Sequence, residues 1–143
     1  MILGLIALIA ATAFTGAAIY INVAEQPARL RLATPELLTE WKPSYSRGLQ
    51  MQVTLVVASA ALSVLEAFVV GDWRWLVGGV IIALNIPFTL FIIMPTNNVL
   101  KATDPAAADE RTRDLVEQWG RLHAVRSLLG FASVVAFLWA AAQ

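Results

Sequence analysis

His123 is the single histidine of the chain, and it lies close to an arginine on the same predicted helix. Trp119, His123, Arg126 and Gly130 stand at positions i, i+4, i+7 and i+11, so a helix presents all four on one face. A neutral imidazole can remove a proton from a substrate, and a guanidinium can stabilise the oxyanion that results. His123 is therefore our candidate catalytic base, and Arg126 is our candidate for stabilising the oxyanion.

Other interpretations of these side chains stay open at the level of sequence. His123 could bind a metal ion or haem, but one histidine in a chain without cysteine is a poor donor set, so we expect no metal and no cofactor. It could also simply bond a neighbouring carboxylate at the membrane interface. Glu25 is our candidate to orient His123 in catalysis, and its structural alternative is an ion pair with Arg47 or Arg126. The alternative for Arg126 is to extend to the membrane surface.

The composition indicates an integral membrane protein. Of the 143 residues, 59% are hydrophobic and 14% are charged. Soluble domains have about 45–50% apolar and about 25% charged residues. The net charge is zero and no basic block is present, so we expect no nucleic-acid partner.

Four apolar runs have the length of about 20 residues that a membrane-spanning helix needs. These predicted spans cover residues 2–23, 50–70, 76–94 and 122–142. The first run lacks the basic start of a secretory signal, and Pro27 predicts that its helix frays near Glu25. Asn85 and Pro87 are predicted to interrupt the third span. We expect one transmembrane domain over residues 1–143.

The spans predict an all-α integral membrane four-helix bundle with short amphipathic helices in the two cytoplasmic connections. One of these helices would lie at the membrane surface over residues 35–42. The other would begin at Asp104-Pro105 and run directly into the fourth span.

The distribution of basic residues predicts the orientation. Of the ten Lys and Arg residues, Arg74 belongs to the short hairpin between the second and third spans, and the other nine lie on the side of the two long connections. The positive-inside rule then places the long loops in the cytoplasm and both termini outside. In a bacterial-type cell this corresponds to a multi-pass protein of the inner membrane.

This topology brings polar ends of all four spans together at the cytoplasmic boundary. Polar groups at membrane depth usually face the interior of the bundle. We therefore predict a polar pocket in which eight further residues contact a ligand, namely Asn22, Trp41, Tyr45, Arg47, Gln50, Asn97, Asn98 and Trp119. Asn97 and Asn98 could instead only cap the third helix, and Asn85 could only satisfy the backbone that Pro87 frees.

Three sequence elements resemble the anthrone-oxygenase-like family of small four-helix membrane proteins. The first is Pro95-Thr96-Asn97-Asn98, followed about twenty residues later by the Trp119, His123, Arg126 and Gly130 pattern. The others are Glu25-Gln26-Pro27-Ala28-Arg29 and the approach to the second span from Tyr45 to Gln50. The resemblance implies oxidation of anthrones to anthraquinones by molecular oxygen, as in some members, without a bound metal or flavin.

Two functional hypotheses follow. In the first, the protein is an oxygenase that removes a proton from a flat, apolar, phenolic substrate and lets the anion reduce oxygen. In the second, it is non-catalytic and binds a lipid or quinone, or serves as an accessory subunit of a larger membrane complex. Both give it membrane lipid and a hydrophobic small molecule as partners, and small residues in the first and fourth spans permit a homo-oligomer. A transporter is disfavoured because the spans show no internal repeat.

Overall fold

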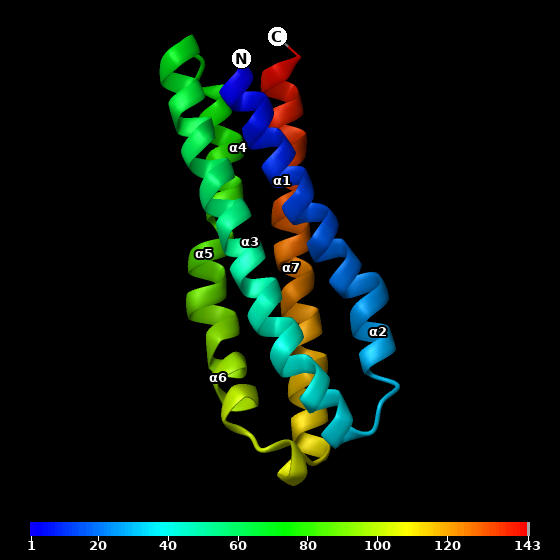
Figure 1. Cartoon of the computed structure of the whole chain (residues 1–143). Coiled ribbons are helices and arrows are strands. Elements are labelled where there is room, and N and C mark those ends of the chain that lie inside the picture. Colours follow the sequence, from blue (N-terminus) through cyan, green and yellow to red (C-terminus); the bar gives the residue numbers. More distant parts are fainter. Residues whose placement is uncertain (143) are drawn as a thin grey trace.

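The computed structural model describes residues 1–142 and is built from four long antiparallel helices (Figure 1). The first contains α1 (Ile2–Tyr20), the π-helical turn η1 (Ile21–Glu25) and α2 (Gln26–Arg29). The second is α3 (Thr34–Val70). The third contains α4 (Arg74–Ala83), α5 (Asn85–Phe88), the π turn η2 (Thr89–Ile93) and α6 (Met94–Ala102). A 3-10 turn, η3 (Pro105–Ala107), precedes the fourth, α7 (Glu110–Ala141).

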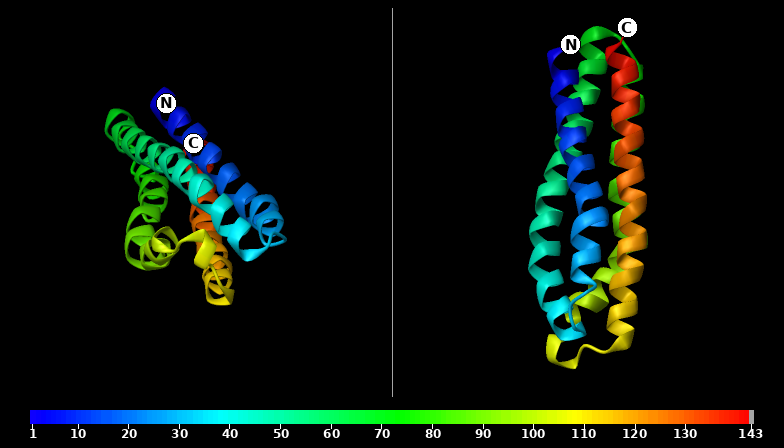
Figure 2. Two further views of the ribbon diagram at one scale, coloured as in Figure 1. Left: turned by 60° about the horizontal axis from the view of Figure 1, so that its bottom comes forward. Right: turned by 90° about the vertical axis from the view of Figure 1, so that its right-hand side faces the viewer.

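The helices run side by side, with the chain's start, its end and the hairpin at Gly71 at one end of the bundle (Figure 2). The connections 30–33 and 103–109 lie at the other end. α1 and α4 each pack against both α3 and α7. The predicted all-α four-helix architecture is therefore confirmed.

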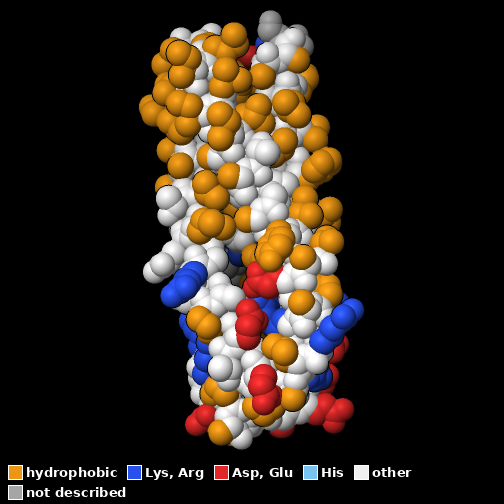
Figure 3. All heavy atoms as spheres, turned by 45° about the vertical axis from the view of Figure 1, so that its right-hand side comes forward, with side chains coloured by type: hydrophobic (Ala, Val, Ile, Leu, Met, Phe, Trp, Pro, Cys, Tyr) orange, Lys and Arg blue, Asp and Glu red, His pale blue; other side chains and the backbone are white. Residues whose placement is uncertain are grey.

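All four long helices are apolar and long enough to cross a membrane, which makes this a multi-pass membrane protein. α3, with 37 residues, is about 56 Å long at 1.5 Å per residue, and the hydrocarbon core of a bilayer is only about 30 Å thick. On the face drawn in Figure 3, hydrophobic side chains cover the half of the bundle that carries the N-terminus, and charged side chains gather at the other end. The charged end must therefore extend beyond the hydrocarbon layer.

The connections differ from the prediction of separate short helices. Residues 35–42 form the first turns of α3, because Leu37, Leu38 and Trp41 are completely buried inside the bundle instead of lying on a membrane surface. In the second connection, Pro105 begins only the short turn η3. α7 begins five residues later, where Asp109 and Thr112 form a capping box. The backbone N–H of Thr112 donates a hydrogen bond to the Asp109 carboxylate and thereby lowers the pKa of that carboxyl.

The prediction that the first helix frays near Glu25 is wrong, because a π turn accommodates Pro27. The proline ring would clash with the carbonyl four residues earlier, at Val23, which lies inside η1. The backbone N–H of Gln26 instead bonds the carbonyl of Ile21, five residues back. η2 precedes Pro95 in the same way. The predicted interruption near Asn85 and Pro87 is confirmed, since α4 and α5 are separated at Leu84.

Two apolar clusters lie at different heights in the bundle. The membrane-embedded cluster surrounds Phe14, Trp75 and Phe137, and close helix contacts there depend on small residues such as Gly78. The second cluster surrounds Trp41 and Trp119 near the charged end. The buried polar residues considered below belong to neither cluster.

Candidate functional site

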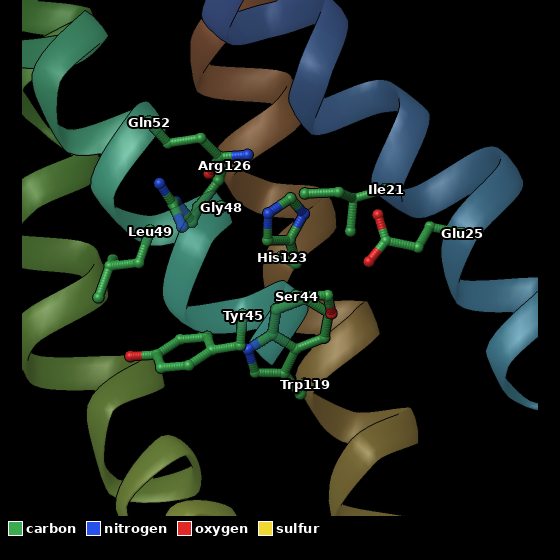
Figure 4. A pocket seen from close by; sticks show the side chains of 10 residues that line it. All are labelled: Ile21, Glu25, Ser44, Tyr45, Gly48, Leu49, Gln52, Trp119, His123 and Arg126. Carbon is green, nitrogen blue, oxygen red and sulfur yellow. The ribbon is translucent and has the colours of Figure 1, made fainter. Parts of the chain in front are cut away.

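A small cavity lies where the first, second and fourth long helices meet, and it contains both residues of our candidate pair (Figure 4). Its volume is about 20 Å³, room for roughly one water-sized molecule. The lining residues are Ile21, Glu25, Ser44, Tyr45, Gly48, Leu49, Gln52, Trp119, His123 and Arg126. Arg126 is 15 residues before Ala141, the end of α7, or about 22 Å along the helix. The cavity therefore lies near the edge of the hydrocarbon layer on the side of the connections 30–33 and 103–109.

The face of α7 predicted to carry chemistry is buried. Trp119, His123 and Arg126 are 5%, 1% and 6% exposed, and Gly130 packs against Phe14 and Thr15. The ring of Trp119 lies 5.0 Å from that of His123 between centroids. The helical spacing of these four residues thus correctly predicted which face of α7 points into the bundle.

Asn22, not Glu25, bonds the His123 ring. The Asn22 side-chain amide donates to the carbonyl of Gly120 at 2.9 Å, which directs its Oδ1 towards α7. Oδ1 accepts the Ser127 hydroxyl at 2.8 Å and lies 3.1 Å from Nδ1 of His123. Because an amide oxygen only accepts, Nδ1 must carry the proton, and Nε2 is left with its lone pair. Nε2 is the ring atom that can act as a base.

Arg126 is a buried guanidinium without a carboxylate partner within residues 1–142. Its Nε has no hydrogen-bond partner in that range, and its guanidinium carbon lies 5.5 Å from the centre of the Phe14 ring. An unpaired buried charge is costly, and it recovers much of that cost when it meets an anion. The arrangement is therefore suited to a ligand that is, or becomes, negatively charged.

Glu25 lines the cavity but is held by Arg29. The Arg29 guanidinium is buried, bonds Glu25, Glu40 and Ser44, and lies 5.7 Å from the Trp119 ring centre. This arginine joins η1 and α2 to α3 and α7. The contacts of Glu25 therefore favour its structural interpretation, although its ion pair is with Arg29 instead of Arg47 or Arg126. Its predicted role in catalysis stays untested.

The three aromatic residues that were predicted to contact a ligand form a closed cluster. Trp41 is completely buried, stacks on Tyr45 at 4.7 Å between ring centroids, and meets Trp119 edge to face at 5.8 Å. The hydroxyl of Tyr45 accepts the side-chain amide of Asn97 at 3.1 Å. Tyr45 and Trp119 line the side of the small cavity that faces this cluster. The rings contact one another and leave no flat opening between them.

Three of the predicted contact residues lie on the outside. Arg47, Gln50 and Asn98 are exposed, whereas their near neighbours Gln52 and Asn97 are completely buried. Gln52 was not singled out from the sequence. Its side-chain oxygen and nitrogen have no hydrogen-bond partner in the described part of the chain, and it lines the small cavity. A position two residues from Gln50 is rotated by about 200° around a helix, so a small error of register exchanges inside and outside.

A second, larger hollow opens between α3 and the third long helix. This crevice has a cavity volume of about 340 Å³ and an almost wholly apolar lining. It is lined by Leu49, Val53, Val56, Val57, Asn85, Ile86, Thr89, Leu90, Met94 and Arg126. Leu49 and Arg126 therefore border both the crevice and the small cavity.

The fold and the site together define a small multi-pass membrane protein whose polar site contains a histidine and an unpaired arginine. The chain belongs to the anthrone oxygenase family, whose model matches residues 41–136. It is 32% identical over 111 residues to an anthrone oxygenase of Claviceps purpurea (strain 20.1), an alignment that covers 69% of this chain and 64% of that protein. It is 29% identical over 142 residues to anthrone oxygenase AgnL2 of Paecilomyces divaricatus, over 86% of this chain and 85% of that one. No solved structure matches the chain.

The matched region runs from Trp41 to Ala136 and so includes both His123 and Arg126. The family resemblance expected from the three sequence elements is confirmed. The chain spans about 64% of the length of the Claviceps protein, so the relatives' activity is applied to this protein below as a proposal.

Proposed function

We propose that this protein is an oxygenase that acts on a flat, apolar, phenolic substrate of the anthrone type with molecular oxygen, without metal or flavin. We further propose that it lies in a bacterial-type inner membrane with its two longer connections in the cytoplasm. The observation that carries the proposal is the unpaired, buried guanidinium of Arg126 three residues from a histidine whose Nε2 is free to accept a proton.

The reaction begins with removal of a proton from the methylene carbon of the anthrone by Nε2 of His123. The negative charge moves to the ketone oxygen, where the Arg126 guanidinium stabilises it. Burial strengthens this interaction because little water screens it. The resulting anion is electron-rich enough to pass one electron to oxygen directly.

The remaining steps balance without another oxidant. The substrate radical and superoxide combine, so a C–O bond forms at the former methylene carbon, and the imidazolium returns its proton to the peroxide. Removal of the second C–H proton then breaks the O–O bond, and the leaving hydroxide is protonated to water. Anthrone and one O₂ thus give anthraquinone and one water, with oxygen reduced by four electrons.

The first test replaces the proposed base. His123→Gln keeps a polar side chain of similar size but lacks a basic nitrogen, so oxygen uptake with anthrone should fall by about 10²–10⁴-fold. Arg126→Gln should lower turnover by about 10²–10³-fold, since it removes the charge at the developing oxyanion. Arg121→Gln makes the same change at an exposed position of α7 and should leave turnover near wild type.

Two outcomes would contradict the proposal. Full activity of folded His123→Gln would exclude this residue as the base. A haem or flavin band in the visible spectrum of the protein purified in mild detergent would contradict direct reaction between substrate and oxygen. Binding of anthrone without any oxygen uptake by the wild type would instead support the non-catalytic hypothesis.

A further inference from the structure

The small cavity beside His123 cannot hold the rings of the proposed substrate. About 20 Å³ is too little for a three-ring molecule, and the aromatic cluster of Trp41, Tyr45 and Trp119 is closed. The crevice between α3 and the third long helix has about 340 Å³, within the range of about 300–1,000 Å³ found for small-molecule sites. Its inner end reaches Arg126.

The outer rim of the crevice faces lipid. Val53, Val57 and Leu90 are exposed apolar residues on this rim. Thr89 is 15 residues after Arg74, about 22 Å along the third long helix, so the crevice lies within the hydrocarbon layer. An apolar ligand dissolved in the bilayer can therefore enter sideways without crossing water.

Two polar atoms that have no partner within residues 1–142, Oδ1 of Asn85 and Oγ1 of Thr89, lie directly beneath the apolar lining of the crevice. Their residues are only 2% and 7% exposed. The Asn85 amide nitrogen donates to the carbonyl of Ile82 at 3.0 Å, which assigns Oδ1 as the free atom. A carbonyl oxygen in such a place needs a donor, and an apolar acyl chain supplies none.

We propose that this crevice is the binding site for a planar tricyclic ligand whose ketone oxygen meets Arg126. When the ligand binds, the side chains of Asn85 and Thr89 turn towards it, so that one ring hydroxyl donates to Oδ1 of Asn85 and accepts the hydroxyl proton of Thr89. The inference deepens the proposed function, and it rests on that function for the role of Arg126. It predicts that ring hydroxylation away from the ketone determines which tricyclic ketones bind well.

The test uses ligands that bind but cannot react. Xanthone has an ether oxygen in place of the reactive methylene, and 2- and 3-hydroxyxanthone add one hydroxyl that is too far from the ketone to bond it. Binding to the full chain in lipid nanodiscs is followed by quenching of tryptophan fluorescence at a fixed ratio of ligand to lipid. One or both hydroxyxanthones should bind about 5- to 10-fold more tightly than xanthone, as expected for one additional hydrogen bond.

Thr89→Val is the decisive variant, because it removes a hydroxyl without a protein partner and keeps the shape of the side chain. It should lower the hydroxyl preference at least threefold and leave the affinity for xanthone unchanged, and Asn85→Ala should do the same if its helix stays folded. Thr54→Val makes the same change at an exposed threonine outside the crevice and should leave the preference unchanged. Because preferences are compared between variants, differences in membrane partitioning cancel.

The outcomes separate this inference from the proposed function. An unchanged hydroxyl preference in folded Thr89→Val, or no binding of any xanthone to the wild type, would overturn the crevice as the ligand site. Loss of the preference in Thr89→Val would support it even if no oxygen were consumed with anthrone. Full turnover by His123→Gln would overturn the proposed base and leave the binding results intact.

Discussion

At the scale of single residues, the important finding is that Asn22 fixes which nitrogen of His123 is protonated. The amide of Asn22 joins three partners on α7, the carbonyl of Gly120, the hydroxyl of Ser127 and the ring of His123. A histidine base is effective only if its lone pair faces the substrate. Asn22 is therefore a positioning residue for the proposed reaction.

Asn22→Leu should reduce kcat for oxygen uptake about 10- to 100-fold with little change in KM, because the ring loses the acceptor that fixes its tautomer. Ser127→Ala is the matched control. It removes another bond to the same Oδ1 and should change kcat less than threefold. Steady-state oxygen-electrode kinetics on both purified variants provide the measurement, and an equal loss in the two would assign the network a purely structural role.

The sequence correctly predicted which side chains face inward where a long pattern supported the prediction. The inward position of His123 and Arg126 was predictable because they belong to a face of four residues that extends over three turns of α7. Gln50 and Asn98 were wrong as inward-facing residues because short polar pairs do not define a helix face. The sequence analysis paired Glu25 with Arg47 or Arg126 and missed Arg29, which lies four residues later on the same helix and holds the Glu25 carboxylate.

At the scale of elements, the hydropathy of the sequence was sufficient to find all four long helices but not their irregularities. Apolar length is a strong signal, and four runs of suitable length leave few alternatives. The π turns η1 and η2 carry no such signal, because they arise where a proline and tertiary packing act together. For the same reason the crevice, which lies beside η2, could not be predicted.

Close contact between α4 and α7 makes a prediction about stability. A Cβ added at Gly78 would lie 2.4 Å from the ring of Phe137, which is completely buried and cannot move aside. Gly78→Ala should therefore lower the free energy of unfolding by about 1–3 kcal/mol. Gly16→Ala is the control, because nothing lies within 4 Å of its added Cβ, and it should gain up to about 1 kcal/mol from helix propensity.

Thermal unfolding in detergent, followed by circular dichroism, measures both glycine variants. The expected result is a lower melting temperature for Gly78→Ala and an equal or higher one for Gly16→Ala. A Gly78→Ala protein as stable as the wild type would contradict the close approach of α4 to Phe137 of α7.

At the scale of the whole molecule, the asymmetry of charge along the bundle makes the proposed orientation testable. Hydrophobic side chains dominate the end with the Gly71 hairpin, and the charged end contains the connections 30–33 and 103–109 (Figure 3). The chain has no cysteine, so a single introduced thiol reports its own side of the membrane without any background.

Ala106→Cys in η3 should react with a membrane-impermeant maleimide only after the cells are permeabilised. Asp72→Cys in the hairpin should react in intact cells. The cysteine-free parent is the control for unspecific labelling. The reverse pattern would invert the proposed topology and place the polar site on the outer side.

Because the crevice opens towards lipid, the concentration that governs binding is that of the ligand in the membrane and not that in the buffer. A ligand that enters from the hydrocarbon is sensed as its mole fraction in the lipid, so diluting a fixed amount of it with additional vesicles should weaken apparent binding even though the buffer volume stays constant. An apparent Kd or KM expressed per litre therefore combines recognition with the ligand's solubility in the membrane. Values from cells, vesicles and micelles become comparable only after they are divided by the amount of amphiphile present.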